Sequence, residues 1–205
     1  DFVYNGVKYQ PMTFAKNALK FKADDYMCLT SFTHHPFYYS FIPEVPDNFS
    51  NGSYYNVPLS SLINSVKSAL ASGYTVLWDA DVSNNGFNGK KGMALLLKPT
   101  DNDESVFTNP DYKEESYSPQ TRQQLFENLT TQDDHLMHIV GIEKSKGGKT
   151  FFIVKNSWGD IGPYGGYVHV SESYFAVNTI GVVVPKSALD IKLLGMITPT
   201  TSSGR

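Results

Sequence analysis

The residues from His135 onward fall into short runs in which apolar and polar side chains alternate, and this pattern constrains the fold more than any other feature. A period of two is typical of β-strands, because successive side chains point to opposite faces of a sheet. A turn at Gly147-Gly148 separates two of the runs and predicts an antiparallel hairpin. We therefore expect an antiparallel sheet that includes residues 138–142, 149–155, 167–170 and 180–184.

The middle of the chain adds one clear helix to this sheet. Apolar residues recur at helical spacing between residues 60 and 72, Ser60 or Ser61 can cap the start, and Gly73 closes the end. The pattern also predicts a buried strand, an exposed loop with three prolines and a shorter helix, over residues 74–82, 98–120 and 121–129 respectively.

The first 58 residues are rich in aromatic residues and turn formers, and five prolines interrupt any long helix. Residues 14–19 have room for one or two helical turns, and the remainder is expected to be irregular chain. We therefore divide the chain into a connecting segment that packs on the main domain (1–58), a strand-rich domain (59–190) and a flexible tail (191–205).

Composition and charge exclude several classes of function. Hydrophobic residues make up 40% of the chain and charged residues 18%, as in ordinary globular proteins. The formal net charge of −3 offers no basic face to a nucleic-acid partner. No apolar run approaches the roughly 18 residues that a membrane span needs. Cys28 is the only cysteine, so an intrachain disulfide is impossible.

A histidine and an asparagine stand where they can form a general-base pair. His135 opens one strand of the predicted hairpin, and Asn156 directly follows the other. An amide oxygen that accepts the imidazole N–H holds the ring in one tautomer without adding a charge. Trp158 can lie over this hydrogen bond and exclude water. We take His135 and Asn156 as candidate catalytic residues and Trp158 and Asp134 as their support; a satisfied surface histidine beside a simple turn is the alternative.

These residues lie in blocks that resemble those of papain-like cysteine peptidases. Asp-His-Leu-Met-His-Ile-Val-Gly-Ile, then Val-Lys-Asn-Ser-Trp-Gly, then Tyr-Gly-Gly-Tyr-Val-His-Val are similar to the family's His block, Asn block and following strand. Residues 30–37, 55–59 and 130–135 resemble the bleomycin hydrolase/aminopeptidase C branch. The resemblance implies an α+β fold, the strand-rich papain-like half, with a twisted antiparallel sheet or partial barrel and a packed helix. It also implies that His135 is the general base and that Asn156 orients it.

The resemblance further implies that this chain is the C-terminal half of a longer enzyme. The family's nucleophilic cysteine, and the glutamine of its oxyanion hole, belong to a helical N-terminal region that these residues do not match. Cys28 is a poor substitute, because the papain-type surroundings are absent and no helix follows to lower the thiol pKa. We expect Cys28 to be a part-buried structural residue, and an apolar face of this chain to bind the N-terminal half.

In the complete enzyme the family implies thiol-dependent removal of residues from the N-terminus of peptides, without a metal or a cofactor. The expected partners are a peptide substrate, the N-terminal half and, in a ring, further copies of the chain. This chain alone is expected to be inactive. The family suggests the cytoplasm, but the compartment stays open because residues 1–6 carry no signal peptide and we expect further chain upstream. A papain-like module that only binds peptides or a protein partner is the alternative.

Other patterns in the sequence predict no further site. Residues 79–90 resemble a calcium loop but carry Asn84 and Lys90 where Gly and Glu are needed. The pair His34-His35 has no further ligand at helical spacing. His138 is expected on the strand face opposite to His135, so the two histidines do not share a metal.

Overall fold

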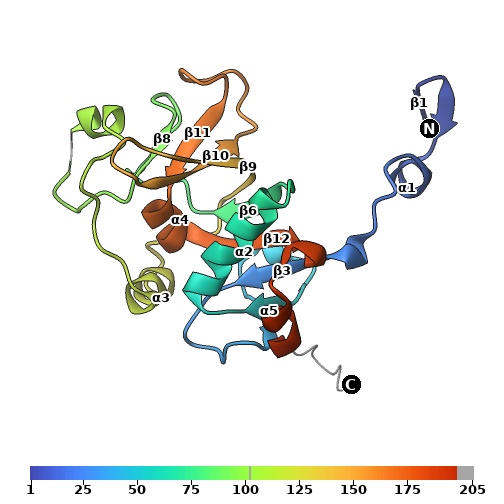
Figure 1. Ribbon diagram of the computed structural model, residues 1–205, viewed down its shortest axis with the longest axis horizontal. Coiled ribbons are helices and arrows are strands. Elements are labelled where there is room, and N and C mark those ends of the chain that lie inside the picture. Colours follow the sequence, from blue (N-terminus) through green and yellow to red (C-terminus); the bar gives the residue numbers. More distant parts are fainter. Residues whose placement is uncertain (102, 198–205) are drawn as a thin grey trace.

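The computed structural model describes residues 1–101 and 103–197. Its main feature is a twisted ten-stranded sheet in the order β4-β5-β3-β12-β6-β9-β10-β11-β8-β7 (Figure 1). Neighbouring strands are antiparallel except for the pairs β3–β5 and β11–β8. The strands are β3 (Tyr26–Thr30), β4 (Ser40–Phe41), β5 (Tyr54–Asn56), β6 (Val76–Ala80), β7 (Phe87–Asn88), β8 (Met93–Ala94), β9 (His135–Lys144), β10 (Thr150–Lys155), β11 (Tyr167–Ser171) and β12 (Thr179–Pro185).

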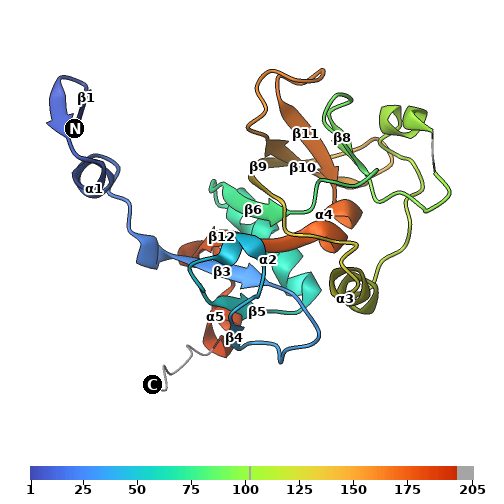
Figure 2. The same cartoon turned by 180° about the vertical axis from the view of Figure 1, so that it is seen from behind.

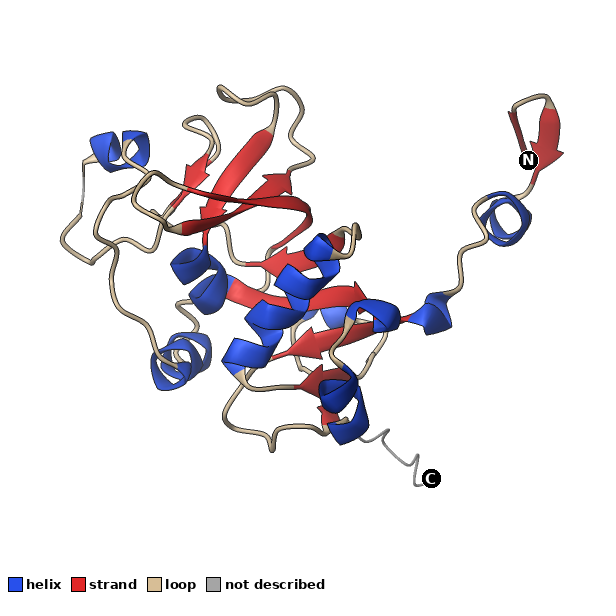
Figure 3. Ribbon diagram, in the orientation of Figure 1, coloured by secondary structure: helices blue, strands red, loops and turns tan. Residues whose placement is uncertain are grey.

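Helix α2 (Leu59–Ala71) crosses one face of this sheet and builds the main core with it (Figure 3). Leu62, Val66 and Ala69 recur every three or four residues, so they share one side of the helix, and all three are fully buried. They join side chains of the central strands in one cluster, and each buried Leu or Val contributes about 1.5–3 kcal/mol of transfer free energy. The expected combination of a twisted sheet and a packed helix is confirmed.

The other helices are short and lie beside or beyond the sheet. Ser118 caps α3, as its side chain accepts the backbone N–H of Thr121 at 3.0 Å. Ser60 and Ser61 are wrong as N-caps of α2, because Pro58, which has no N–H to satisfy, stands at that position. Gly73 closes the helix with a φ of +81°, as predicted. The helices are α1 (Pro11–Thr13), α3 (Pro119–Glu127), α4 (Glu172–Asn178) and α5 (Ile191–Met196), with single turns at Phe14–Ala18, Ala23–Asp25, Pro46–Asn48, Glu104–Thr108 and Lys186–Ala188.

Two expectations about the ends of the chain are wrong in part. Tyr26–Thr30 is not irregular but forms β3, which lies between β12 and β5 and buries Leu29 completely (Figure 2). Ile191–Met196 is not a flexible tail but helix α5, which Asp190 caps and Leu193 anchors in the core. The pairing of β3 with β12 and the burial of Leu193 join residues that are far apart in sequence, so no local pattern reveals them. The rest of the predicted tail, 198–205, lies outside the described residues.

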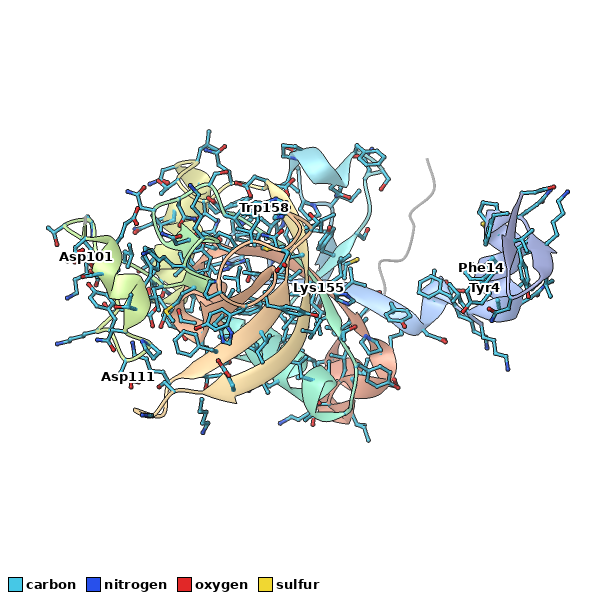
Figure 4. The ribbon with its side chains drawn as sticks, turned by 90° about the horizontal axis from the view of Figure 1, so that it is seen from above. Tyr4, Phe14, Asp101, Asp111, Lys155 and Trp158 are labelled. Carbon is cyan, nitrogen blue, oxygen red and sulfur yellow. The ribbon has the colours of Figure 1, made fainter. Side chains whose placement is uncertain are left out.

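Residues 1–20 form an N-terminal arm that stands away from the sheet (Figures 1 and 4). A hairpin of β1 (Phe2–Tyr4) and β2 (Val7–Tyr9) turns at Asn5-Gly6, where both residues have a positive φ. The ring of Phe14 contacts the rings of Phe2, Tyr4 and Tyr9 edge-on, with centroids 5.1–5.3 Å apart. The arm therefore holds its shape through its own aromatic cluster.

Candidate active site

Two neighbouring strands bring His135 and Asn156 to the same place. His135 is the first residue of β9 and pairs with Ala80, the last residue of β6. Asn156 directly follows β10, whose last residue, Lys155, pairs with His138. Because β9 and β10 are antiparallel, the start of one lies beside the end of the other. The hairpin thus sets the two side chains next to each other, as the sequence predicts.

The hydrogen bond between them fixes the tautomer of the imidazole. Nε2 of His135 lies 2.8 Å from Oδ1 of Asn156. The backbone N–H of Ser157 also donates to this atom, at 2.7 Å, which identifies it as the amide oxygen rather than the nitrogen. An oxygen without hydrogens can only accept, so Nε2 carries a proton, and in the neutral ring the lone pair is on Nδ1. The ring is therefore held with Nδ1 as its free base.

Trp158 packs against the imidazole of this pair. Its ring stacks on the His135 ring, with centroids 5.0 Å apart and planes 27° apart. The Phe87 ring meets the indole edge-on at 5.8 Å. Gly89 lies so close that a Cβ there would be 3.3 Å from the indole. Strand β7 and the turn that follows it thus support the indole. The sequence does not reveal Phe87 and Gly89 as neighbours of Trp158, because they are far from it along the chain and meet it only in the folded structure.

Asp134 acts on the backbone that leads into the site. Its carboxylate accepts the N–H groups of Val82 and Ser83, at 3.0 and 3.1 Å. The nearly buried Asp81 accepts the N–H groups of Ser83 and Gln132, at 2.9 and 2.8 Å. The two carboxylates tie the loop after β6 to the segment before β9. Asp134 therefore lies beside the candidate pair in sequence but contacts the loop.

A glycine-rich loop, residues 157–166, returns the chain from Asn156 to β11. The Asn156 N–H donates to the Gly166 carbonyl at 3.2 Å. Gly166 has a φ of +81°, and a Cβ there would lie 2.2 Å from the Gly159 carbonyl oxygen. Only glycine fits this position, because a side chain would collide with the backbone of the same loop.

Cys28 lies too far from His135 to attack a substrate held there. It belongs to β3, which is three strands away from β9 in the sheet, or about 14 Å at the usual strand spacing. Its pairing row runs through Val183 and Leu77 to His138, not to His135. Burial raises the pKa of the Cys28 thiol, which opposes formation of the thiolate.

The remaining histidines form no metal centre. His34 is hydrogen-bonded through Nδ1 to Gln123 Nε2 at 2.9 Å, and its ring lies 4.5 Å from that of His35. His138 is exposed on the outer face of the sheet. Among the side chains that the structure describes, no three of His, Cys, Asp or Glu gather as a metal site would require. Nor does any helix within residues 1–101 and 103–197 have the length and apolar character of a membrane span.

The chain is similar to known proteins over most of its length. A family model described as Peptidase C1-like family matches residues 3–201. Aminopeptidase G of Lactobacillus delbrueckii subsp. lactis is 26% identical over 186 residues, which cover 87% of this chain and 39% of that protein. The crystal structure of PepW from Lactobacillus rhamnosis HN001 has a TM-score of 0.71 and 20% identity, covering 93% of this chain and 42% of that chain.

These findings agree with the resemblance read from the His and Asn blocks. The likeness to PepW concerns the fold, and the family match covers both blocks together with the β-strands that carry them. The chain spans about two fifths of the length of these relatives. It belongs to the Peptidase C1-like family, the papain-like cysteine peptidases.

Proposed function

We propose that this chain supplies the general base, His135, and its orienting amide, Asn156, to a cysteine aminopeptidase whose nucleophilic thiol lies outside these 205 residues. The observation that carries the proposal is the 2.8 Å hydrogen bond from Nε2 of His135 to Asn156, which leaves Nδ1 as a base under the cover of Trp158. The thiol comes from elsewhere, because Cys28 is three strands away and burial raises its pKa.

In this reaction Nδ1 of His135 takes the proton of the thiol, which gives a thiolate and an imidazolium. The thiolate bonds to the carbonyl carbon of the peptide, and the C–N bond breaks as the imidazolium protonates the leaving amine. Water then attacks the thioester while Nδ1 accepts its proton, which releases the acyl product and restores the thiol. Asn156 holds the imidazole ring in the same orientation during both proton transfers.

The outer face of the sheet around Cys28 is the surface we assign to the thiol-bearing half. Leu77 and Leu136 lie on adjacent strands there and are 41% and 46% exposed. Cys28, Leu77 and His138 line a cavity of about 470 Å³ on this face. Exposure of apolar side chains on a sheet face to water is unfavourable, and a second domain that covers the face would remove this unfavourable exposure.

Removal of N-terminal residues is the proposed specificity. The support is the name of the relative Aminopeptidase G, which is 26% identical over a stretch that covers 87% of this chain. Turnover of aminoacyl reporter substrates by this chain together with its thiol-bearing half tests it. Cleavage that requires a free amino terminus agrees with an aminopeptidase. Equal cleavage of amino-blocked substrates contradicts it, and thiol-independent binding without cleavage favours the non-enzymatic module.

The origin of the thiol is tested by intact-mass measurement after exposure to a papain-type epoxide inhibitor. We expect no adduct on this chain, and one adduct on the polypeptide that carries the nucleophilic cysteine. An adduct on Cys28 that is abolished by His135→Ala would show that this chain contains its own nucleophile. The variant Cys28→Ala is the matched control, since it should leave the labelling of the other polypeptide unchanged.

A further inference from the structure

A cavity of about 800 Å³ lies on the far side of the turn that supports Trp158. Its floor consists of Met93, Phe107 and Phe151, which belong to a second small core apart from the main one. Its walls come from the β7–β8 turn, the glycine-rich loop 157–166 and the β9–β10 hairpin. Neither the proposed chemistry nor the surface assigned to the thiol-bearing half uses this cavity.

The rim of the cavity is positively charged. Lys90, Lys91 and Lys144 line it, and none of them forms an ion pair within the described part of the chain. Glu143 is the carboxylate on the lining, and it is already bonded to His169. Three ammonium groups without an ion-pair partner thus line one cavity of a chain whose net charge is −3. They create a local field that attracts anions.

The cavity shares its walls with the candidate active site. Lys90 and Lys91 lie in the same turn as Gly89, which contacts the Trp158 indole. A Cβ on Gly162 would lie 2.5 Å from the Gly89 carbonyl oxygen, so the turn and the glycine-rich loop are in direct backbone contact. A ligand that binds Lys90 and Lys91 therefore contacts the same turn that packs against Trp158.

We propose that this cavity binds an acidic peptide segment. An apolar side chain of the peptide would pack on Tyr164, which lines the cavity and is 46% exposed, and flanking carboxylates would meet Lys90, Lys91 and Lys144. The volume lies within the range of about 300–1,000 Å³ that is usual for ligand sites. A small inorganic anion fits less well, because it would leave the exposed ring of Tyr164 uncovered. Binding here requires no thiol, so it is independent of the proposed catalysis.

The probe is the acetylated, amidated tripeptide Asp-Phe-Glu, compared by calorimetry with its neutral counterpart Asn-Phe-Gln. We expect the acidic peptide to bind at least tenfold more tightly and to lose affinity as salt is raised. The double variant Lys90→Gln, Lys144→Gln should weaken binding about tenfold. Lys192→Gln is the matched control, since this exposed lysine lies on α5, far from β8 and β11 (Figure 1). Binding should also change the fluorescence of Trp158, and Trp158→Phe should abolish that change.

Three outcomes would overturn the proposal. Equal affinity for the neutral peptide would remove the role of the lysines, and an equal loss in Lys192→Gln would reduce it to general charge attraction. Equal affinity for Asp-Ala-Glu would remove the role of the exposed Tyr164 ring and leave an adventitious anion contact only. Binding that is lost in His135→Ala but kept in the lysine variants would place the peptide in the candidate active site instead.

Discussion

Asn156 has one oxygen and two amide hydrogens to satisfy in a place that is only 7% exposed. The oxygen accepts from both His135 and Ser157, whereas Nδ2 has no hydrogen-bond partner among the described residues. A buried donor without a partner costs about 1–3 kcal/mol. Such a cost is typical of residues kept for function rather than for stability. The amide is thus placed to serve the imidazole, and its own nitrogen is left unsatisfied.

Substitution Asn156→Ala should release the imidazole. Without an acceptor for Nε2–H, the neutral ring is expected to populate both tautomers, which ¹⁵N chemical shifts of His135 report in this chain alone. Ser157→Ala keeps the backbone N–H and should leave the tautomer unchanged. In the enzyme with its thiol, His135→Ala should lower kcat by about 10²–10⁴-fold, the usual worth of a general base. An unchanged tautomer ratio in Asn156→Ala would contradict the orienting role.

Cys28 should titrate as a structural cysteine. Burial raises the pKa of its thiol, so the folded state favours the neutral form. The resulting stabilisation is complete below the unfolded-state pKa of about 8.5 and is lost as the pH rises through the folded-state pKa. Unfolding midpoints should therefore fall more between pH 8 and 10 in the native chain than in Cys28→Ala. Alkylation at neutral pH that is faster than for free cysteine would contradict this.

Arg122 on α3 connects three elements that the sequence keeps apart. Its Nε donates to the Ser31 carbonyl at 2.7 Å, and its Nη1 donates to the carbonyls of Ala176 and Val177 at 3.1 and 3.0 Å. The guanidinium lies 4.5 Å from the centre of the Phe32 ring. Burial lowers its pKa to about 9, so the group is still charged at pH 7. The helix, the loop after β3 and the end of α4 are therefore joined by one side chain.

Replacing this side chain with an apolar one of similar length should weaken the fold. Arg122→Met leaves three carbonyls without their charged donor, and we expect a loss of about 2–4 kcal/mol in the free energy of unfolding. Gln124→Met on the exposed side of the same helix is the control and should change it by less than about 0.5 kcal/mol. Equal midpoints of the two variants in urea would show that the buried guanidinium contributes little.

Gly166 in the glycine-rich loop and Gly148 in the β9–β10 turn form a matched pair for substitution. Gly166 and Gly148 both have a positive φ, but a Cβ on Gly166 would lie 2.2 Å from a carbonyl oxygen and one on Gly148 would meet nothing within 4 Å. Both alanine variants pay the cost of the strained φ, about 1–2 kcal/mol. Only Gly166→Ala should also displace the loop, which Trp158 fluorescence would report. The same spectrum for both variants would show that the loop yields without moving the indole.

The strands that carry the candidate site are predicted well from the sequence where the pattern that indicates them is local. The hairpin of β9 and β10, and hence the meeting of His135 with Asn156, follows from alternation and a Gly-Gly turn. Strand β3 is missed, because its five residues are surrounded by prolines and rings and are stabilised by pairing with β12, more than 150 residues later. The contact of Gly89 with Trp158 is missed for the same reason. Tertiary contacts of this kind leave no periodic trace.

At the scale of the whole molecule, two apolar surfaces have no partner within the described chain. One is the N-terminal arm, where Val3 and Met12 are 69% and 81% exposed although the rings around Phe14 pack together. The other is the outer sheet face with Leu77 and Leu136. Exposed apolar patches are common at sites of association. We propose that another polypeptide covers these two surfaces.

Introducing negative charges on the outer face of the sheet tests whether this face binds another polypeptide. In sedimentation velocity at rising concentration, we expect the chain alone to self-associate, because Leu77 and Leu136 lie uncovered on adjacent strands. The double variant Leu77→Glu, Leu136→Glu should remain monomeric, because burying two carboxylates costs more than the contact returns. It should also fail to bind the thiol-bearing half. Ile191→Glu is the matched control: Ile191 is 87% exposed on α5, so its replacement should change neither result. If the double variant binds that half as tightly as the native chain does, the interface lies elsewhere, and the arm becomes the surface to examine by the same substitution at Val3 and Met12.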